Sequence, residues 1–218
     1  ECVVLARYHA AAAGPRQPVP NIPPVTAWRG SAGLVILSLR NTRVQLRVGI
    51  GGAGHVGRFH ALKSAANPAE NLVALFDPDP ARAATVAREA RCAVAETYEA
   101  LLNSVEAVII AAPAEHHFRL ASEALNADRH VLVEKPIAAT LDEARNLADL
   151  ASRTGKVLQV GHLLRYSAEH RAITERIDKP LYIEATRSAP FRPRGTDVSV
   201  SLDLMIHDLD LVLAIVDS

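Results

Sequence analysis

The chain of 218 residues is poor in cysteine and in aromatic residues, and it carries no net charge. Cys2 and Cys92 are far apart and neither stands in the spacing of a zinc ligand set, so neither a disulfide framework nor a structural zinc site is expected. Lysine plus arginine and aspartate plus glutamate both number 24. This balance offers no attraction to nucleic acid or to an anionic membrane.

Long apolar runs and a secretory leader are also missing. The longest apolar runs, such as Ala107–Ala112, are far shorter than the roughly 20 residues that cross a bilayer. The first residues have neither the basic start nor the cleavage pattern of a signal peptide. Together with the sparse cysteines, these absences predict a cytoplasmic protein that binds neither membrane nor nucleic acid.

Residues 1–43 differ from the rest of the chain because they are rich in proline. Five of the 13 prolines lie there: Pro15, Pro18, Pro20, Pro23 and Pro24. Proline at this density sustains neither a helix nor a central strand. Leu34–Leu39 has the character of a short strand but no obvious partner. We predict a poorly ordered extension that is not native to the folded protein.

A regular alternation of strands and helices begins at residue 44 and runs to residue 164. Strands are expected at Val48–Ile50, Leu72–Phe76, Cys92–Ala95, Ala107–Ala111, Val131–Val133 and Val157–Val160. Helices are expected up to Ala66, after the N-cap Asp79, at Glu115–Ala127, and at Thr140–Thr154 with a Thr140/Glu143 capping box. This alternation predicts an α/β domain with a doubly wound parallel sheet of the Rossmann type.

The pattern changes in residues 165–218. Helices are expected at Ala168–Ile177 and Leu202–Val216, with one strand at Leu181–Ala185 between them. One strand and two helices cannot close a core of their own. We therefore predict the truncated start of a second, α+β domain.

A GxGxxG turn lies directly after the first expected strand and opens a helix. Its glycines permit a tight turn, close approach of the backbone to a pyrophosphate, and close helix packing. Asp77 ends the second strand, where its carboxylate would accept hydrogen bonds from ribose hydroxyls and repel a 2′-phosphate. This favours NAD over NADP, although Arg82 nearby softens the preference. The predicted cofactor contacts are Gly52, Gly54, His55, Val56, Gly57 and Asp77.

Two further groups of residues suit the oxidation of an alcohol. Lys135 ends the fifth strand, and the carboxyl edge of an open α/β sheet is where ligands bind; its amine can stabilise an alkoxide, but taken alone it also fits a solvated turn. Asp203 and His207 stand at i and i+4, on one helical face. A neutral imidazole can take a hydroxyl proton, and a carboxylate can orient it. A helix-surface pair stays an alternative, whereas the lack of a third ligand disfavours metal.

Together these residues resemble the glucose–fructose oxidoreductase / inositol dehydrogenase / MocA (Gfo/Idh/MocA) family. The likeness includes VGIGGAGHVGRFHA, LFDPDPARA, AVIIAAPAEHH, HVLVEKPIAAT and DLMIHDLD. It implies that Lys135 is the catalytic lysine and that Asp203 and His207 are the Asp/His pair. It also implies that the nicotinamide-side loop is contributed by Pro113 and His117, and that Glu134 and Lys135 contact the cofactor.

One departure narrows the resemblance. Met205 stands where many members have glycine, and DLMIHDLD with APFRPRGTDVSV and GHLLRY is similar to the subgroup that contains UDP-N-acetylglucosamine 3-dehydrogenases. This implies hydride transfer from a sugar or sugar-nucleotide hydroxyl to NAD. Arg192 and Arg194 are candidates for contacting a substrate diphosphate, or are solvated loop residues.

Two other functions stay open on the sequence alone. One is a non-catalytic dinucleotide-binding regulator, which would have no need for Lys135, Asp203 and His207. The other is an NAD-dependent glycoside hydrolase, which only product analysis separates from a dehydrogenase. We expect a homo-oligomer at full length, and we expect this chain alone to bind NAD with little or no activity.

Overall fold

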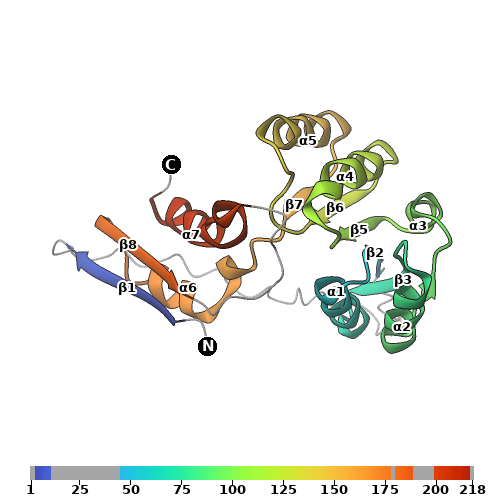
Figure 1. Ribbon diagram of the computed structural model, residues 1–218, viewed down its shortest axis with the longest axis horizontal. Coiled ribbons are helices and arrows are strands. Elements are labelled where there is room, and N and C mark those ends of the chain that lie inside the picture. The colour runs from blue at the N-terminus through green and yellow to red at the C-terminus, as the bar shows by residue number, and fades with distance from the viewer. Residues whose placement is uncertain (1–2, 11–44, 178–179, 189–198, 217–218) are drawn as a thin grey trace, which may run out of the picture.

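A six-stranded parallel sheet forms the centre of the computed structural model, which describes residues 3–10, 45–177, 180–188 and 199–216 (Figure 1). Its strands are β2 (Leu46–Gly51), β3 (Glu70–Phe76), β4 (Ala93–Val94), β5 (Ala107–Ile110), β6 (His130–Val133) and β7 (Leu158–Val160). They lie in the order β4-β3-β2-β5-β6-β7. This confirms the predicted Rossmann sheet.

Helices cover both faces of the sheet (Figure 1). They are α1 (His55–Ala66), α2 (Pro80–Ala90), α3 (Tyr98–Ser104), α4 (His117–Asn126) and α5 (Leu141–Thr154). One apolar core joins α1 and α2 to Ile50 and Leu75. The other joins α3, α4 and α5 to Val108 and Ile110 on the opposite face. Burial of these two cores is the main force that fixes the strand ends, where the site lies.

Local capping sets the first residue of several helices. The Asp79 carboxylate accepts hydrogen bonds from the backbone N–H groups of Ala81 and Arg82, at 3.0 and 3.2 Å, as expected for an N-cap before Pro80. Thr140 and Glu143 form the predicted capping box at the start of α5. The predicted helix Glu115–Ala127 divides into a 3₁₀ turn, η1 (Ala114–His116), and α4.

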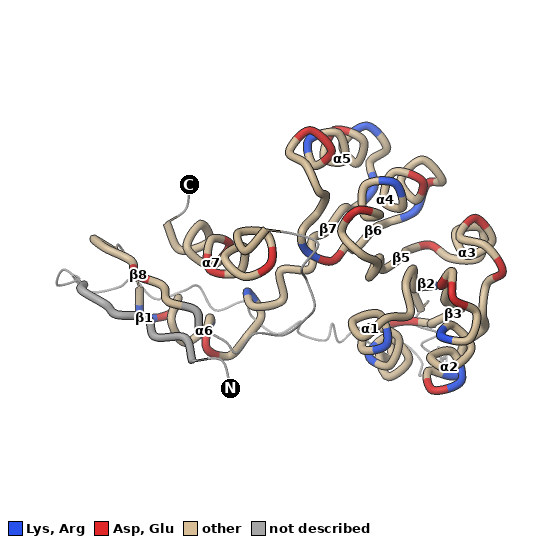
Figure 2. The backbone as a smooth tube through the Cα atoms, viewed as in Figure 1, with Lys and Arg blue, Asp and Glu red and all other residues tan. Residues whose placement is uncertain are grey.

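Charged residues on the outer helices lie beside partners of opposite sign (Figure 2). Arg119 and Glu123 are 2.8 Å apart on α4, and Arg145 and Asp142 are 3.7 Å apart on α5. Exposed pairs of this kind add about 0–1 kcal/mol each to stability. Among the described residues no helix is long and apolar enough to span a membrane.

The described residues of 163–177, 180–188 and 199–216 lie outside the central sheet. They form η2 (Leu163–Tyr166), α6 (Ala168–Thr174), β8 (Pro180–Ser188), a π-helical turn η3 (Ser201–Met205) and α7 (Ile206–Val216). The single regular helix predicted over Leu202–Val216 is therefore wrong in its first turn. A π turn inserts an extra residue into the hydrogen-bond spacing, which sequence periodicity does not reveal, and such turns are frequent at functional sites.

One further strand lies near the start of the chain and was not predicted. Val3–Ala10 form a strand, β1, which pairs antiparallel with β8 from Val3 opposite Ser188 to Ala10 opposite Pro180. The strand was not predicted because its partner lies about 180 residues away in sequence and leaves no local signal. The possible strand Leu34–Leu39 lies outside the described residues, and the division into 1–43, 44–164 and 165–218 stays a prediction.

The strand order reverses between β2 and β5. β3 and β4 follow on one side of β2, whereas β5, β6 and β7 lie on the other. Ligands of open α/β sheets bind outside the carboxyl ends of the strands at this switch point. The residues after β2, β3, β5 and β6 all meet at that edge, and they include every site residue predicted in the first domain.

Candidate active site

Two glycines of the GxGxxG turn are required by the protein's own packing. Gly52 has a φ of 103°, and a Cβ there would lie 2.6 Å from the carbonyl oxygen of Ala111. A Cβ on Gly57 would overlap the carbonyl group of Gly52. The turn after β2 is thus pressed against both the β5 exit and helix α1, and side chains at these two positions do not fit.

The middle glycine faces open space instead. Gly54 is the N-cap of α1, its backbone is extended, no side chain caps the helix there, and a Cβ would meet nothing within 4 Å. His55 and Val56 follow as the first exposed residues of the helix. Uncapped N–H groups at a helix start bind phosphate well. The turn therefore fits the pyrophosphate of a dinucleotide on its open side.

Asp77, at the end of β3, is buried against this turn. Its carboxylate accepts a hydrogen bond of 2.7 Å from the backbone N–H of Ala53 and one of 2.9 Å from that of Asp79. Each carboxylate oxygen can accept a second bond, so a ribose contact remains compatible with this arrangement. Arg82 reaches the same corner, with Nη1 3.7 Å from Asp77 and Nη2 3.2 Å from Asp79.

An open cavity of about 670 Å³ occupies this corner, between the glycine-rich turn and the start of α2. Its lining includes Gly54, His55, Asp79 and Arg82. The backbone N–H groups of Arg82 and Ala81 lower the pKa of Asp79, as does the Arg82 side chain. A cavity with donors at a helix start and an ionised carboxylate beside it suits a nucleotide with its sugar hydroxyls.

Lys135, which follows β6, directly contacts Asp203 of the predicted Asp/His pair. Its Nζ donates hydrogen bonds of 3.0 Å to Oδ1 of Asp203 and 3.0 Å to the backbone oxygen of the same residue. Both side chains are only partly exposed. The structure thus brings together two predicted catalytic residues that are 68 positions apart.

His207 is the second residue of α7, in the turn that follows the π-helical turn holding Asp203. Its side chain is partly buried. The π turn changes the angular spacing between Asp203 and His207 from that of a regular α-helix. For His207 the structure gives the position in the fold, and its role as a base stays a prediction.

His117, the first residue of α4, is completely buried. Its Nδ1 lies 2.6 Å from the carbonyl oxygen of Pro136, and its Nε2 lies 2.8 Å from that of Ala112. Pro113 follows Ala112 and precedes η1. Both ring nitrogens therefore have protein partners, and the predicted contact between this loop and a cofactor stays a prediction.

Glu134 forms a buried contact with a histidine of α1. Its Oε1 is 2.7 Å from Nε2 of His60, and both side chains are largely buried. Burial raises the pKa of the Glu134 carboxyl, but the hydrogen bond and charge of His60 and the contacts of Lys135 outweigh it, so the pKa lies below its ordinary value. Glu134 is thus held as a carboxylate immediately before the predicted catalytic lysine.

Comparison with known proteins matches residues 46–162, just over half of the chain, to an oxidoreductase family with an NAD-binding Rossmann fold, Gfo/Idh/MocA. The chain belongs to this family. The match confirms the resemblance inferred from the sequence motifs, and it covers the glycine-rich turn, Asp77, His117 and Lys135.

Family members of known activity include sugar dehydrogenases. UDP-N-acetylglucosamine 3-dehydrogenase of Acidithiobacillus ferrooxidans is 43% identical over 171 residues, which are 78% of this chain and 54% of the relative. A solved structure of that enzyme has a TM-score of 0.75 at 42% identity, with 80% of this chain and 58% of that chain covered. Inositol 2-dehydrogenase of Rubrobacter xylanophilus is 34% identical over 182 residues, 79% of this chain and 52% of the relative.

The structure of GenD2 from gentamicin A biosynthesis was solved in complex with NAD. It is 30% identical, has a TM-score of 0.59, and covers 69% of this chain and 41% of that chain. The chain spans about half the length of the curated family members it matches.

Sequence reasoning missed the contacts of three side chains in and beside the site. His60 was given no role, yet it contacts Glu134. Arg165 donates two hydrogen bonds, of 2.7 and 2.6 Å, to the buried carboxylate of Asp210 and so ties η2 to α7. The only available signal for this last pair was the position of Asp210 seven residues, or about two α-helical turns, after Asp203. Arg192 and Arg194 lie outside the described residues.

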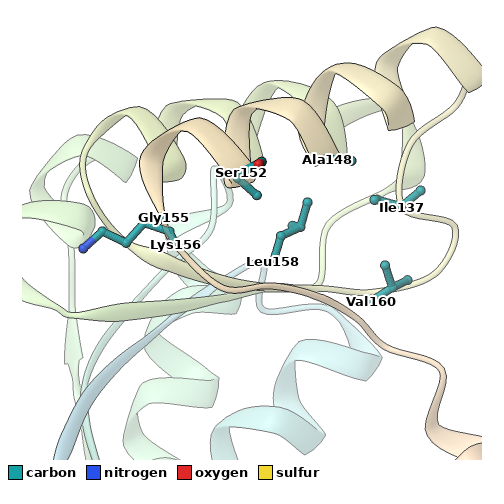
Figure 3. A pocket seen from close by; sticks show the side chains of 8 residues that line it. Ile137, Ala148, Ser152, Gly155, Lys156, Leu158 and Val160 are labelled. Atoms are coloured by element: carbon teal, nitrogen blue, oxygen red, sulfur yellow. The ribbon is translucent and has the colours of Figure 1, made fainter.

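A second cavity, of about 520 Å³, lies away from the site between α5 and the edge strand β7 (Figure 3). Ile137, Leu158 and Val160 face it below the helix, and the Lys156 amine points away from it (Figure 3). That amine is paired with Asp128 at 2.8 Å. The lining is mainly apolar, with the Ser152 hydroxyl as a polar group in it (Figure 3).

Proposed function

We propose that this protein is an NAD-dependent oxidoreductase that moves hydride from a hydroxyl-bearing carbon of a sugar or sugar nucleotide to the nicotinamide. The observation that carries the proposal is the contact between Lys135 and Asp203 at the carboxyl edge of the sheet. This contact lies at the same sheet edge as a glycine-rich turn whose open side fits a pyrophosphate. The family membership supports the same chemistry.

The cofactor would supply the hydride acceptor when bound, and the chain's own residues would manage the proton and the developing charge. The glycine-rich turn would hold the pyrophosphate on its open side at Gly54, and Asp77 would hold the adenosine ribose. As hydride leaves the carbon, the hydroxyl must lose its proton, and His207 is the proposed acceptor. Lys135 would donate a hydrogen bond to the alcohol oxygen and stabilise the alkoxide, with Asp203 orienting the amine.

The proposed substrate is a sugar nucleotide oxidised at a ring hydroxyl, with the 3-hydroxyl of UDP-N-acetylglucosamine as the first candidate. The 43% identity to an enzyme of that name supports this choice over inositol. We further propose a cytoplasmic homo-oligomer, which the sparse cysteines and the family resemblance support.

The test is to express the protein from its complete gene and to measure NADH formation with a panel of sugar nucleotides, free sugars and inositols. We expect NADH with a UDP-sugar and a keto product by mass spectrometry. NAD binding without NADH formation on any compound would favour a regulator. Release of a free aglycone without net NADH would favour a glycoside hydrolase.

Asp77 is expected to set the preference for NAD. Asp77→Ala should reduce the ratio of NADP to NAD dissociation constants by about tenfold, because a carboxylate that repels the 2′-phosphate is removed. The loss of its bond to Ala53 should weaken binding of both cofactors. Calorimetric titration with each cofactor measures this, and Arg82→Ala is the matched variant at the same corner. Tighter NADP than NAD binding by the unmodified protein would contradict the assignment.

A further inference from the structure

Lys135 stands between two residues that are each bound by a histidine. His60 Nε2 lies 2.7 Å from Oε1 of Glu134, and His117 Nδ1 lies 2.6 Å from the carbonyl oxygen of Pro136. The histidines come from different elements, since His60 lies on α1 and His117 opens α4. Both helices start next to a loop of the proposed cofactor site.

We propose that His60 and His117 are positioning residues that fix the peptide segment on both sides of Lys135 to the two loops that would hold the cofactor. The assignment of Lys135 as the group that acts on substrate rests on the proposed function. The two histidines act through its neighbours and need not touch cofactor or substrate.

On the first side, His60 joins Lys135 to the glycine-rich turn. α1 begins directly at that turn, and His60 lies in its second turn, with its ring directed at Glu134. Gly161, the residue after β7, also packs against this carboxylate, because a Cβ there would lie 2.9 Å from Oε2 of Glu134. The lowered pKa keeps Glu134 ionised, and a buried carboxylate without its partner His60 would be costly. The residue before Lys135 therefore has a single well-defined position.

On the second side, His117 joins Lys135 to the exit of β5. Its ring spans the carbonyl oxygens of Pro136 and Ala112, at 2.6 and 2.8 Å. Carbonyl oxygens only accept hydrogen bonds and a neutral imidazole has one N–H, so the ring donates to one of these oxygens, according to its tautomer, and contacts the other. The ring is planar and fully buried. It therefore sets the separation between the loop that follows Lys135 and the loop that ends in Pro113.

Fixing the backbone matters because a lysine side chain has four flexible methylene groups. Among the residues that the structure describes, Lys135 Nζ is hydrogen-bonded at its far end to Asp203 alone. A displacement of about 1 Å at a reacting group can cost on the order of 10²-fold in rate. The contacts of His60 with Glu134 and of His117 with Pro136 restrict the backbone on both sides of Lys135. The flexibility of the backbone is then not added to that of the lysine side chain.

The first experiment measures the placement of the amine without any turnover. The protein is acetylated with acetic anhydride, and the labelling rate of Lys135 is followed by peptide mass spectrometry relative to the exposed Lys63. In the unmodified protein we expect slow labelling of Lys135, because its amine is paired with Asp203 and partly buried. In His60→Leu, which lacks the donor, we expect labelling to rise several-fold relative to Lys63.

Conservative variants separate the hydrogen bond from simple packing. His60→Gln places an amide N–H near the former Nε2, so it should restore slow labelling. His117→Asn retains a donor near Nδ1 toward Pro136, whereas His117→Gln retains one near Nε2 toward Ala112. We expect Asn, but not Gln, to keep Lys135 protected. His116→Ala is the control, because the His116 side chain is exposed and lies 3.7 Å from the exposed carboxylate of Glu115.

The second experiment uses protein expressed from the complete gene. His60→Leu should lower kcat by about tenfold or more and change the KM for NAD by less than about threefold, with His60→Gln near the original rate. Equal labelling of Lys135 in the unmodified protein, His60→Leu and His117→Gln would overturn the proposal. If no sugar is oxidised by the unmodified protein, the proposed function fails, while the labelling result still decides whether the histidines position Lys135.

Discussion

Replacing Lys135 by methionine is expected to lower the rate of sugar oxidation on the order of 10²-fold or more, the usual range for a positioned acid–base group. Methionine keeps much of the unbranched stem but removes the three N–H donors that face Asp203 and the alcohol oxygen. The carboxylate left behind is partly exposed and can be hydrated. The variant should therefore fold normally and bind NAD with an affinity close to that of the unmodified protein.

The measurement needs both kcat from NADH formation and the NAD dissociation constant from calorimetry. Lys156→Met is the matched control, because Lys156 also pairs with a carboxylate, that of Asp128 at 2.8 Å. Lys156 precedes β7 and so lies at the amino ends of the strands, away from the site. Lys156→Met should leave both values unchanged. Turnover of Lys135→Met close to that of the unmodified protein would remove this lysine from the mechanism.

His207→Ala is expected to lower kcat by a comparable factor if the imidazole accepts the hydroxyl proton.

The sheet could be predicted from sequence because its signals are local. Each of the six strands is a short apolar run, and the caps at Asp79 and Thr140 are contiguous with the helices they start. Helix α3 is not predicted from the sequence, although Thr97 caps it and Leu101 and Leu102 are buried on its inner face. Its seven residues are too few to show a clear helical period beside the strands on either side.

The edge of the sheet that carries the site could also be predicted, because parallel strands bring their carboxyl ends together. The partners of the site residues could not. His60 and Glu134 are 74 residues apart, and His117 and Pro136 are 19 apart. Nothing in the local sequence distinguishes these histidines from solvated ones. The π turn before α7 likewise leaves no mark in the periodicity of residues 202–216.

The three glycines of the turn should differ sharply when each is replaced by alanine. Gly57→Ala is expected to destabilise the fold by about 2 kcal/mol or more, because its Cβ would overlap the carbonyl group of Gly52 and force α1 away from the turn. NAD binding would be lost as a consequence of that shift. Thermal unfolding followed by circular dichroism measures the stability term separately from the cofactor titration.

Gly54→Ala should show the opposite pattern. Its φ of −68° suits alanine and a Cβ there meets nothing within 4 Å, so the melting temperature should change little. If the backbone at Gly54 is where the pyrophosphate approaches, the added methyl group occupies that space, and the NAD dissociation constant should rise about tenfold, or about 1.4 kcal/mol. Unchanged NAD affinity in Gly54→Ala would mean that the phosphates lie elsewhere. Loss of folding in the same variant would show that this glycine, like Gly52 and Gly57, is required by the protein rather than by the ligand.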